Sequence, residues 1–236
     1  MAEVEGDSAL QSEVLEDLVE AVNYRRWLVA LALPHLGDDP LEIGSGLGHY
    51  AAEWAAAGVP RWTASEADPA RLAELRTRFA ADPVVQVREL TVPITQTGEH
   101  SAVVAYNVLE HIPDDVAALQ AFAGLLRPGG RVVLIVPAFP SAMSRFDLAI
   151  GHQRRYRRAS LQAALESAGL RVRELHHVNL VGLLGWYVMV KGLRGRPKAG
   201  PVLSAYDRGI VPVLRRLEAR RDPPFGQSLF AVAERI

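Results

Sequence analysis

Cysteine is absent from this chain of 236 residues. Its absence excludes disulfide bonds, thiolate metal sites and cysteine nucleophiles, and it is consistent with a reducing compartment. We also expect no secretory signal, because residues 1–10 are acidic and have no apolar core behind a basic start. The sequence therefore predicts a cytoplasmic protein.

Long apolar runs and a large net charge are also missing. The longest uncharged stretch near the C-terminus, residues 175–190, has 16 residues, which is short of the roughly 20 that a membrane-spanning helix needs. The net charge is −1, so no global field favours nucleic acid. Within residues 145–221, however, 16 basic residues outnumber 5 acidic ones. This region is either a solvated surface or a place to receive an anionic substrate or a membrane.

The hydropathy pattern predicts one α/β domain. Apolar residues at the helical period predict a single amphipathic helix over residues 10–33. Strand-like and helix-like segments then alternate, as expected for a mostly parallel sheet with helices on both faces. The predicted strands cover residues 41–43, 61–66, 83–87, 101–106, 132–136, 170–175 and 228–233, and the later helices cover residues 68–80, 113–126 and 160–168.

The last two predicted strands are separated by an insertion at residues 179–226, rich in glycine, proline and arginine. It is too long for a hairpin loop, so we expect it to contain helices of its own and to lie near the functional site.

A glycine-rich turn follows the first predicted strand. Gly44, Gly46 and Gly48 alternate with other residues after Glu42, and such a turn lets a ligand lie against bare backbone. The dinucleotide fingerprint G-x-G-x-x-G would need a third glycine at position 49, which is His49 here. The spacing therefore argues against a nicotinamide or flavin dinucleotide.

An acidic residue ends the second predicted strand. Glu66 stands 18 residues after Gly48, close to the roughly 20 at which a carboxylate meets the ribose hydroxyls of an adenosine. Asp68 is a rival, but it is better placed to cap the following helix. The order of strand, turn, helix, strand and acid thus predicts a nucleoside site.

With these motifs, nearly the whole chain resembles the class I S-adenosylmethionine-dependent methyltransferases, whose fold is a Rossmann-like, seven-stranded, mostly parallel sheet. Further motifs that carry the resemblance are residues 106–114 after the fourth strand, the turn at 125–130, and the segments 151–156 and 224–233, which look like a bacterial small-molecule subgroup. The resemblance implies S-adenosylmethionine as cofactor, with S-adenosylhomocysteine as product. The cofactor-binding residues that it implies are Glu42, Gly44, Ser45, Gly46, Gly48, Glu66, Ala67, Glu89, Leu90 and Asn107. Glu89 departs from the family, which has Asp there.

The predicted organisation is a single domain over residues 1–236. Within it we expect an N-terminal helical cap at 1–36, a cofactor-binding core at 37–140 and an acceptor-side half at 141–236 that contains the insertion.

His111, just beyond the fourth strand, is the predicted catalytic residue. A hydroxyl acceptor needs a base, and an imidazole with its ordinary pKa of about 6.5 suits that task near neutrality. The alternative is that His111 only caps or packs against the following helix.

The predicted acceptor-binding residues are His152, Arg154, Arg155, Tyr156 and Tyr24. Arginine forks could seat an anionic acceptor, or they could pair structurally with Asp147 or Glu166. Tyr24 on the first helix could close over the cofactor or belong to the core. We expect no metal site, because the adjacent His176 and His177 would point to opposite faces of a strand.

Three functions compete at this level. The first is methyl transfer to an oxygen or nitrogen of a small-molecule acceptor that is anionic or amphiphilic, with peripheral membrane contact as an option. The second is a non-catalytic sensor or scaffold that binds S-adenosylmethionine, and the third, disfavoured by the glycine spacing, is a nicotinamide oxidoreductase. Nucleic acid is also disfavoured, because residues 106–109 replace the Asn-Pro-Pro-Tyr type of motif. The sequence specifies no oligomeric state.

Overall fold

A computed structural model describes residues 8–17, 20–196 and 198–236. Its centre is a seven-stranded sheet in the order β3-β2-β1-β4-β5-β7-β6, in which β7 alone runs antiparallel to its neighbours. The strands are β1 (Pro40–Ile43), β2 (Trp62–Glu66), β3 (Val85–Glu89), β4 (His100–Tyr106), β5 (Leu126–Pro137), β6 (Leu170–Val178) and β7 (Ser228–Arg235). The predicted fold class is therefore confirmed.

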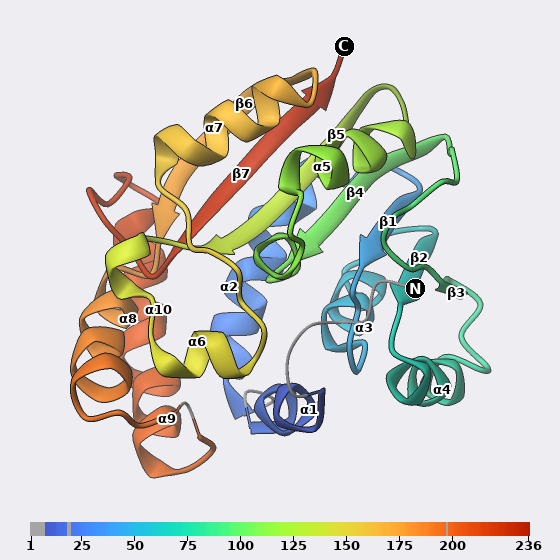
Figure 1. Cartoon of the computed structure of the whole chain (residues 1–236). Helices are drawn as coiled ribbons and strands as arrows, with labels where there is room; N and C mark the ends of the chain where they lie inside the picture. The colour runs from blue at the N-terminus through green and yellow to red at the C-terminus, as the bar shows by residue number, and fades with distance from the viewer. Residues whose placement is uncertain (1–7, 18–19, 197) are drawn as a thin grey trace.

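Helices cover both faces of this sheet (Figure 1). Alternate residues of β4 explain why, because Val103 and Ala105 face one apolar cluster while Val104 and Tyr106 face the other. The helices on the first face are α5 (Asp115–Gly124) and α7 (Arg158–Ser167). Those on the second face are α2 (Val22–Ala32), α3 (His49–Ala56), α4 (Pro69–Arg78) and α10 (Val211–Glu218).

The single helix predicted over residues 10–33 is wrong. The chain instead forms α1 (Ser8–Asp17) and a separate α2, before which Ala21 has non-helical backbone angles. The carboxylate of Asp207, far away in sequence, accepts hydrogen bonds from the backbone N–H groups of Asn23 (3.0 Å) and Tyr24 (2.8 Å). Because those groups are the open donors of a helix start, this tertiary contact sets where α2 begins. Local periodicity does not reveal it.

The insertion at 179–226 contains the helices that were expected: α8 (Leu180–Gly185), α9 (Pro201–Ala205), α10 and the π-helical segments η5 (Trp186–Gly192) and η6 (Tyr206–Ile210). Glu218 on α10 accepts hydrogen bonds from the backbone of Asn179 and Leu180 at 2.9 and 3.0 Å. Figure 1 shows α8 and α9 beyond the end of the sheet at which β4 and β5 finish. The same end carries α6 (Arg145–Ala149) and the short helices η3 (Leu109–His111) and η4 (Pro140–Ala142), whereas η2 (Leu33–His35) follows α2.

Candidate functional site

The turn between β1 and α3 consists largely of glycine because its backbone requires it. Gly44, Gly46 and Gly48 all have positive φ, at 68°, 55° and 73°, a region that side chains other than glycine rarely occupy. A Cβ at Gly44 would also lie 2.8 Å from Val108, and one at Gly48 would lie 2.6 Å from Leu75. The turn is thus bare backbone pressed between the ends of β4 and α4.

A buried network of hydrogen bonds between the ends of β1 and β2 stabilises this turn. The Ser45 hydroxyl donates to the Glu42 carboxylate at 2.7 Å and accepts from the Ser65 backbone N–H at 3.1 Å, while the Ser65 hydroxyl donates to the Glu42 carbonyl at 2.6 Å. Burial raises the pKa of Glu42 to about 7. Glu42 and Ser45, both predicted to contact the cofactor, therefore also fix the shape of the turn.

Glu66 ends β2 directly beside the turn, where the sequence placed it. Its buried carboxylate accepts hydrogen bonds from the backbone N–H groups of Gly46 at 2.8 Å, Ala67 at 2.9 Å and Asp68 at 3.0 Å. Arg71 lies 3.7 Å away. A carboxylate has about four lone-pair sites, so three N–H donors leave capacity for a ligand hydroxyl. Asp68 itself caps α4 by accepting from Ala70 and Arg71.

The remaining predicted cofactor residues line the same edge of the sheet. Glu89 ends β3 in register with Glu66 and is exposed, and the Leu90 that follows is buried. Asn107 follows β4 with φ 53° and an exposed side chain, and its backbone N–H donates to Ile135 at 2.8 Å. The carboxyl ends of β1 to β4 thus bring these residues together, as expected for a ligand site of a parallel sheet.

A second group of polar side chains follows β4. Glu110 on η3 is fully buried, and its carboxylate accepts no hydrogen bond from any residue in the described ranges. Its closest charged neighbour is His152, whose Nε2 lies 3.7 Å from Glu110 Oε1. The ring of His152 meets that of His111 edge to face at 4.6 Å. One ligand atom from each of these three residues lies within 4.8 Å of the others, so the group could hold a metal ion.

His111, the predicted base, does not keep the ordinary pKa of an imidazole. Burial, together with the nearby charge of His152, lowers the pKa of His111 to about 4 rather than leaving it near 6.5. The imidazole is therefore neutral at physiological pH but a weak proton acceptor. Burial also raises the pKa of Glu110 to about 7, an effect that the charge of His152 partly offsets.

The buried Asp147 on α6 organises the segment that follows it. It accepts hydrogen bonds from Arg155 Nη2 at 2.7 Å, from His152 Nδ1 at 2.9 Å and from the hydroxyl of Ser144 at 2.6 Å. Although burial alone would raise the pKa of Asp147, the hydrogen bond from His152 and the charge of Arg155 hold it at about 2. Asp147 is thus a charged partner for two residues predicted to contact the acceptor.

The predicted arginine clamp for an anion needs correction. Arg155 is buried in its pair with Asp147, while Arg154 lies 2.9 Å from Asp115, which also accepts from the Tyr156 hydroxyl at 2.8 Å. The side chains that were expected to face the acceptor are therefore already paired with carboxylates on α5 and α6. Of the two structural partners left open, Asp147 is confirmed, while Glu166 instead accepts from Gln162.

Tyr24 on α2 is half-buried and packs against the core on the second face of the sheet. Burial raises the pKa of its hydroxyl, against hydrogen bonds with Ser228 and Asn179 at the base of the insertion. Its ring meets that of the buried Trp27 edge to face at 6.1 Å. The core alternative therefore describes the Tyr24–Trp27 pair.

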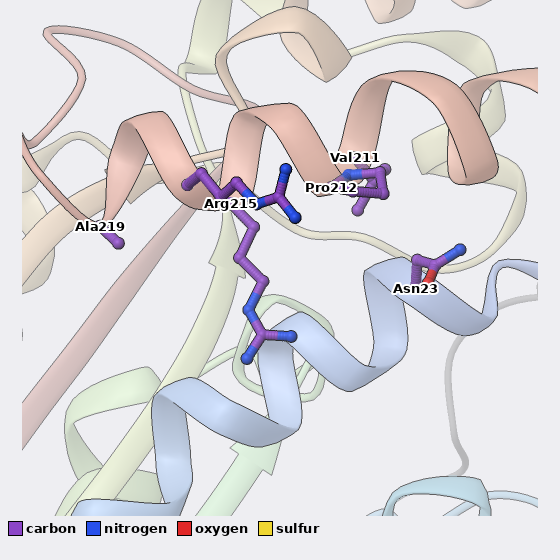
Figure 2. Close-up of a pocket in the computed structure, with 6 residues that line it drawn as sticks. Asn23, Val211, Pro212, Arg215 and Ala219 are labelled. Atoms are coloured by element: carbon purple, nitrogen blue, oxygen red, sulfur yellow. The ribbon is translucent and has the colours of Figure 1, made fainter.

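Two hollows of the described surface lie away from the glycine turn. Figure 2 shows the first, of about 280 Å³, between Asn23 on α2 and Val211, Pro212 and Arg215 on α10. The second, of about 210 Å³, lies between α2, α10 and the end of β6 and includes His176 and His177. Neither contains a residue of the predicted cofactor set. Among the described residues, no helix is long and apolar enough to cross a membrane.

Comparison with known proteins agrees with this arrangement. Residues 19–175 match the model of a family described as a methyltransferase domain. The chain is 35% identical over 111 residues to the ubiquinone biosynthesis O-methyltransferase of Xanthomonas oryzae pv. oryzae, a match that covers 45% of this chain and 46% of the relative. The chain thus spans about half the length of the curated relatives it matches.

Solved structures share the fold at low sequence identity. A Haloferax volcanii protein in complex with the Trm112 methyltransferase activator superposes with a TM-score of 0.62 at 18% identity, covering 93% of this chain and 96% of that one. A geranyl diphosphate methyltransferase in complex with S-adenosylmethionine also gives 0.62, at 17% identity over 88% of this chain and 84% of that one. At such identities the likeness concerns the fold.

Proposed function

The chain belongs to this family of methyltransferase domains, and on that premise we propose that it transfers the methyl group of S-adenosylmethionine to an oxygen of an amphiphilic or anionic small molecule. Membership confirms the predicted resemblance and, with it, S-adenosylmethionine as the cofactor. The acceptor and the role of each site residue are the proposal.

The observation that carries the proposal is the position of the Glu66 carboxylate beside the glycine turn. Its three backbone N–H donors hold it rigidly within reach of Gly46, and a fixed carboxylate suits the two hydroxyls of a ribose. The turn offers bare backbone for the rest of the cofactor. On this basis we assign the cofactor site to the carboxyl ends of β1 to β4. The residues that bind it there are the cofactor-binding residues predicted from the sequence.

Oxygen is favoured over nitrogen because the curated relative is named an O-methyltransferase. The acceptor is assigned to the half at 141–236, since the insertion carries an apolar surface next to cationic side chains. Its exposed apolar residues include Leu184, Val188, Met189 and Leu193, and Lys191 and Arg194 lie among them in the sequence. Trp186 on η5 donates a hydrogen bond to the Ala142 carbonyl at 2.9 Å, and both residues belong to one buried apolar cluster, which holds this surface against η4.

The same surface supports the peripheral membrane contact that the sequence raised. Exposed apolar side chains with basic neighbours can rest on an anionic bilayer without crossing it. An amphiphilic acceptor dissolved in that bilayer would then reach the site directly from the membrane, without passing through water. A cytoplasmic location belongs to the same proposal.

The deciding experiment uses S-adenosylmethionine labelled in its methyl group. Purified protein is incubated with this cofactor and with aqueous and lipid extracts of the source cells, and labelled products are identified by mass spectrometry. We expect a methyl ether in the lipid extract, and none with Gly46→Val, because a branched side chain at this positive φ blocks the backbone approach.

The other outcomes separate the competing functions. Tight binding of S-adenosylmethionine without any labelled product in either extract would support the sensor alternative. Binding of NADH in place of S-adenosylmethionine would contradict the cofactor assignment. A labelled amine, or a product found only in the aqueous extract, would overturn the proposed acceptor class while leaving the reaction intact.

A matched pair of surface variants tests the acceptor side. Leu184→Ser with Val188→Ser alters the exposed face of α8 and η5, whereas Leu217→Ser alters an equally exposed position on α10. We expect the first variant to raise KM for the acceptor several-fold at unchanged KM for S-adenosylmethionine, and the second to change neither. Equal effects of the two variants would contradict the assignment of this surface.

A further inference from the structure

The cluster of Glu110, His111 and His152 joins a fully buried carboxylate to a half-buried imidazole, His111, and contains several unpaired polar atoms. Both carboxylate oxygens of Glu110 and Nδ1 of His111 have no hydrogen-bond partner within the described residues, and the Glu110 side chain is fully buried. Leaving such groups unpaired in the interior is costly, so native proteins rarely do so without a reason. These atoms converge on one point, because one ligand atom from each residue lies within 4.8 Å of the others.

Asp147 orients the ring of His152 toward Glu110. His152 Nδ1 lies 2.9 Å from the Asp147 carboxylate, and its Nε2 lies 3.7 Å from Glu110 Oε1. Asp147 is fixed in turn by Arg155, whose guanidinium lies 4.3 Å from the ring centroid of Trp186. A carboxylate that orients an imidazole from its far side is the usual outer support of a histidine that binds metal.

We propose that Glu110, His111 and His152 bind a divalent first-row transition-metal ion. Two imidazole nitrogens and one carboxylate oxygen are the ligand set of such ions, such as Zn²⁺, Co²⁺ or Mn²⁺, whereas Mg²⁺ and Ca²⁺ prefer oxygen throughout. Metal–ligand bonds of about 2.0–2.2 Å place tetrahedral ligand atoms about 3.4 Å apart, so the three side chains would close in from separations of up to 4.8 Å on binding the ion. Three protein ligands leave at least one position on the ion open.

The cluster lies next to the cofactor turn. Val108, two residues before Glu110, is the side chain that a Cβ at Gly44 would meet. An ion in the cluster would therefore lie near the turn, and a hydroxyl oxygen of the acceptor could complete its ligand set. This part of the inference rests on the proposed function.

Methyl transfer to a hydroxyl bound to this ion would need no protein side chain as a base. A hydroxyl bound to the ion is more acidic and releases its proton to water. Its oxygen then forms a bond to the methyl carbon, and the carbon–sulfur bond breaks with its electron pair remaining on sulfur. The products are a methyl ether and S-adenosylhomocysteine.

The test is a direct titration with Co²⁺ alone. Full-length protein without a histidine tag is stripped with a chelator, and Co²⁺ binding is followed by its visible absorption and by calorimetry. We expect one ion per chain, with bands typical of nitrogen and oxygen ligands. Glu110→Gln and His152→Gln should each weaken binding by more than about 100-fold, because loss of a ligand exceeds the 10–100-fold cost of losing an outer-shell partner.

His176→Gln is the matched control, because it removes a histidine on β6 that lies outside the cluster; it should leave Co²⁺ affinity unchanged. If His152→Gln fails to fold, Glu110→Gln still decides, since its side chain loses no hydrogen bond to a described residue. Absence of Co²⁺, Zn²⁺ and Mn²⁺ binding in the wild type, or binding that survives Glu110→Gln, overturns the proposal. A cluster satisfied by water is what those results would show.

S-Adenosylmethionine affinity is measured on the same variants without an acceptor. It should stay within about twofold of the wild type, because the cofactor residues are untouched. Loss of metal binding with intact cofactor binding supports the proposal, and intact metal binding without any methyl transfer would contradict only the proposed function.

Discussion

Glu66 and Glu110 are two buried carboxylates on either side of β1 that differ in how they are satisfied. Glu66 at the end of β2 accepts three backbone N–H groups from its own neighbourhood. Glu110 after β4 accepts none from the part of the chain that is described. The first is therefore complete before any ligand arrives, whereas the second depends on a partner. The carboxylate on the cofactor side is thus held in place by the chain itself, whereas the one on the acceptor side is not.

The largest expected effect on stability comes from removing Asp147, the carboxylate that holds His152 beside Glu110. Asp147→Ala leaves the buried Arg155 guanidinium and the His152 ring without their acceptor, which should lower the free energy of unfolding by about 3–5 kcal/mol. Urea unfolding measures it. Asp38→Ala is the control, because its pair with Arg127 is exposed, and it should change the free energy of unfolding only slightly. Equal costs would contradict the distinction between buried and exposed support.

The Glu66 side should respond to pH through Glu42. The folded-state pKa of about 7 lies above the ordinary 4.5, so the folded protein binds this proton more tightly than the unfolded chain does. The stabilisation is fully present below pH 4.5 and is lost as the pH rises through 7. Relative to Glu42→Gln, the wild type should lose on the order of 3 kcal/mol over that range. Unfolding free energies of both proteins measured from pH 4.5 to 8 should converge at the acid end, and curves that stay parallel would disprove the shift.

Matched Glu→Gln variants at positions 66 and 110, measured in metal-free buffer, test whether the two carboxylates differ. Glu66→Gln places an amide against three N–H donors and should cost about 1–3 kcal/mol of stability, while weakening S-adenosylmethionine by a similar amount. Glu110→Gln should change stability by no more than about 0.5 kcal/mol, or raise it, because no described hydrogen bond is lost and a buried charge is removed. Equal changes in the free energy of unfolding for the two variants would contradict the view that only the Glu66 carboxylate is stabilised by hydrogen bonds from the chain.

The sequence predicted most of the cofactor side because its signals are local. The glycines between positions 44 and 48 and the acid at 66 belong to one strand, turn, helix and strand unit, and the hydrogen bonds that hold the turn join residues at most 23 positions apart. The mostly parallel sheet with helices on both faces followed from the alternation of strand-like and helix-like segments.

The acceptor side was harder to predict because its contacts are distant in the chain. Asp207 caps α2 from more than 180 residues away, and His152 meets Glu110 only after α5, β5 and α6 have been placed. Hence the break in the opening helix and the pairing of Arg154 with Asp115 were missed, and the expectation of no metal site considered only His176 and His177. The Glu110–His111 doublet directly after a buried strand was the available signal.

The smallest expected effect lies beside Glu66, on the next strand. Glu89 is paired with Glu66 in the β2–β3 register but is exposed, so a hydrogen bond from its carboxylate to bound cofactor competes with water. Such a bond contributes about 0.5–1.5 kcal/mol, and Glu89→Gln should weaken S-adenosylmethionine by only about two- to tenfold, as measured by calorimetry. The free energy of unfolding should not change, because this exposed side chain contributes little to the fold. A loss as large as that of Glu66→Gln would show that burial and backbone donors do not set the difference between these two acids, and that the cofactor holds Glu89 as firmly as the chain holds Glu66.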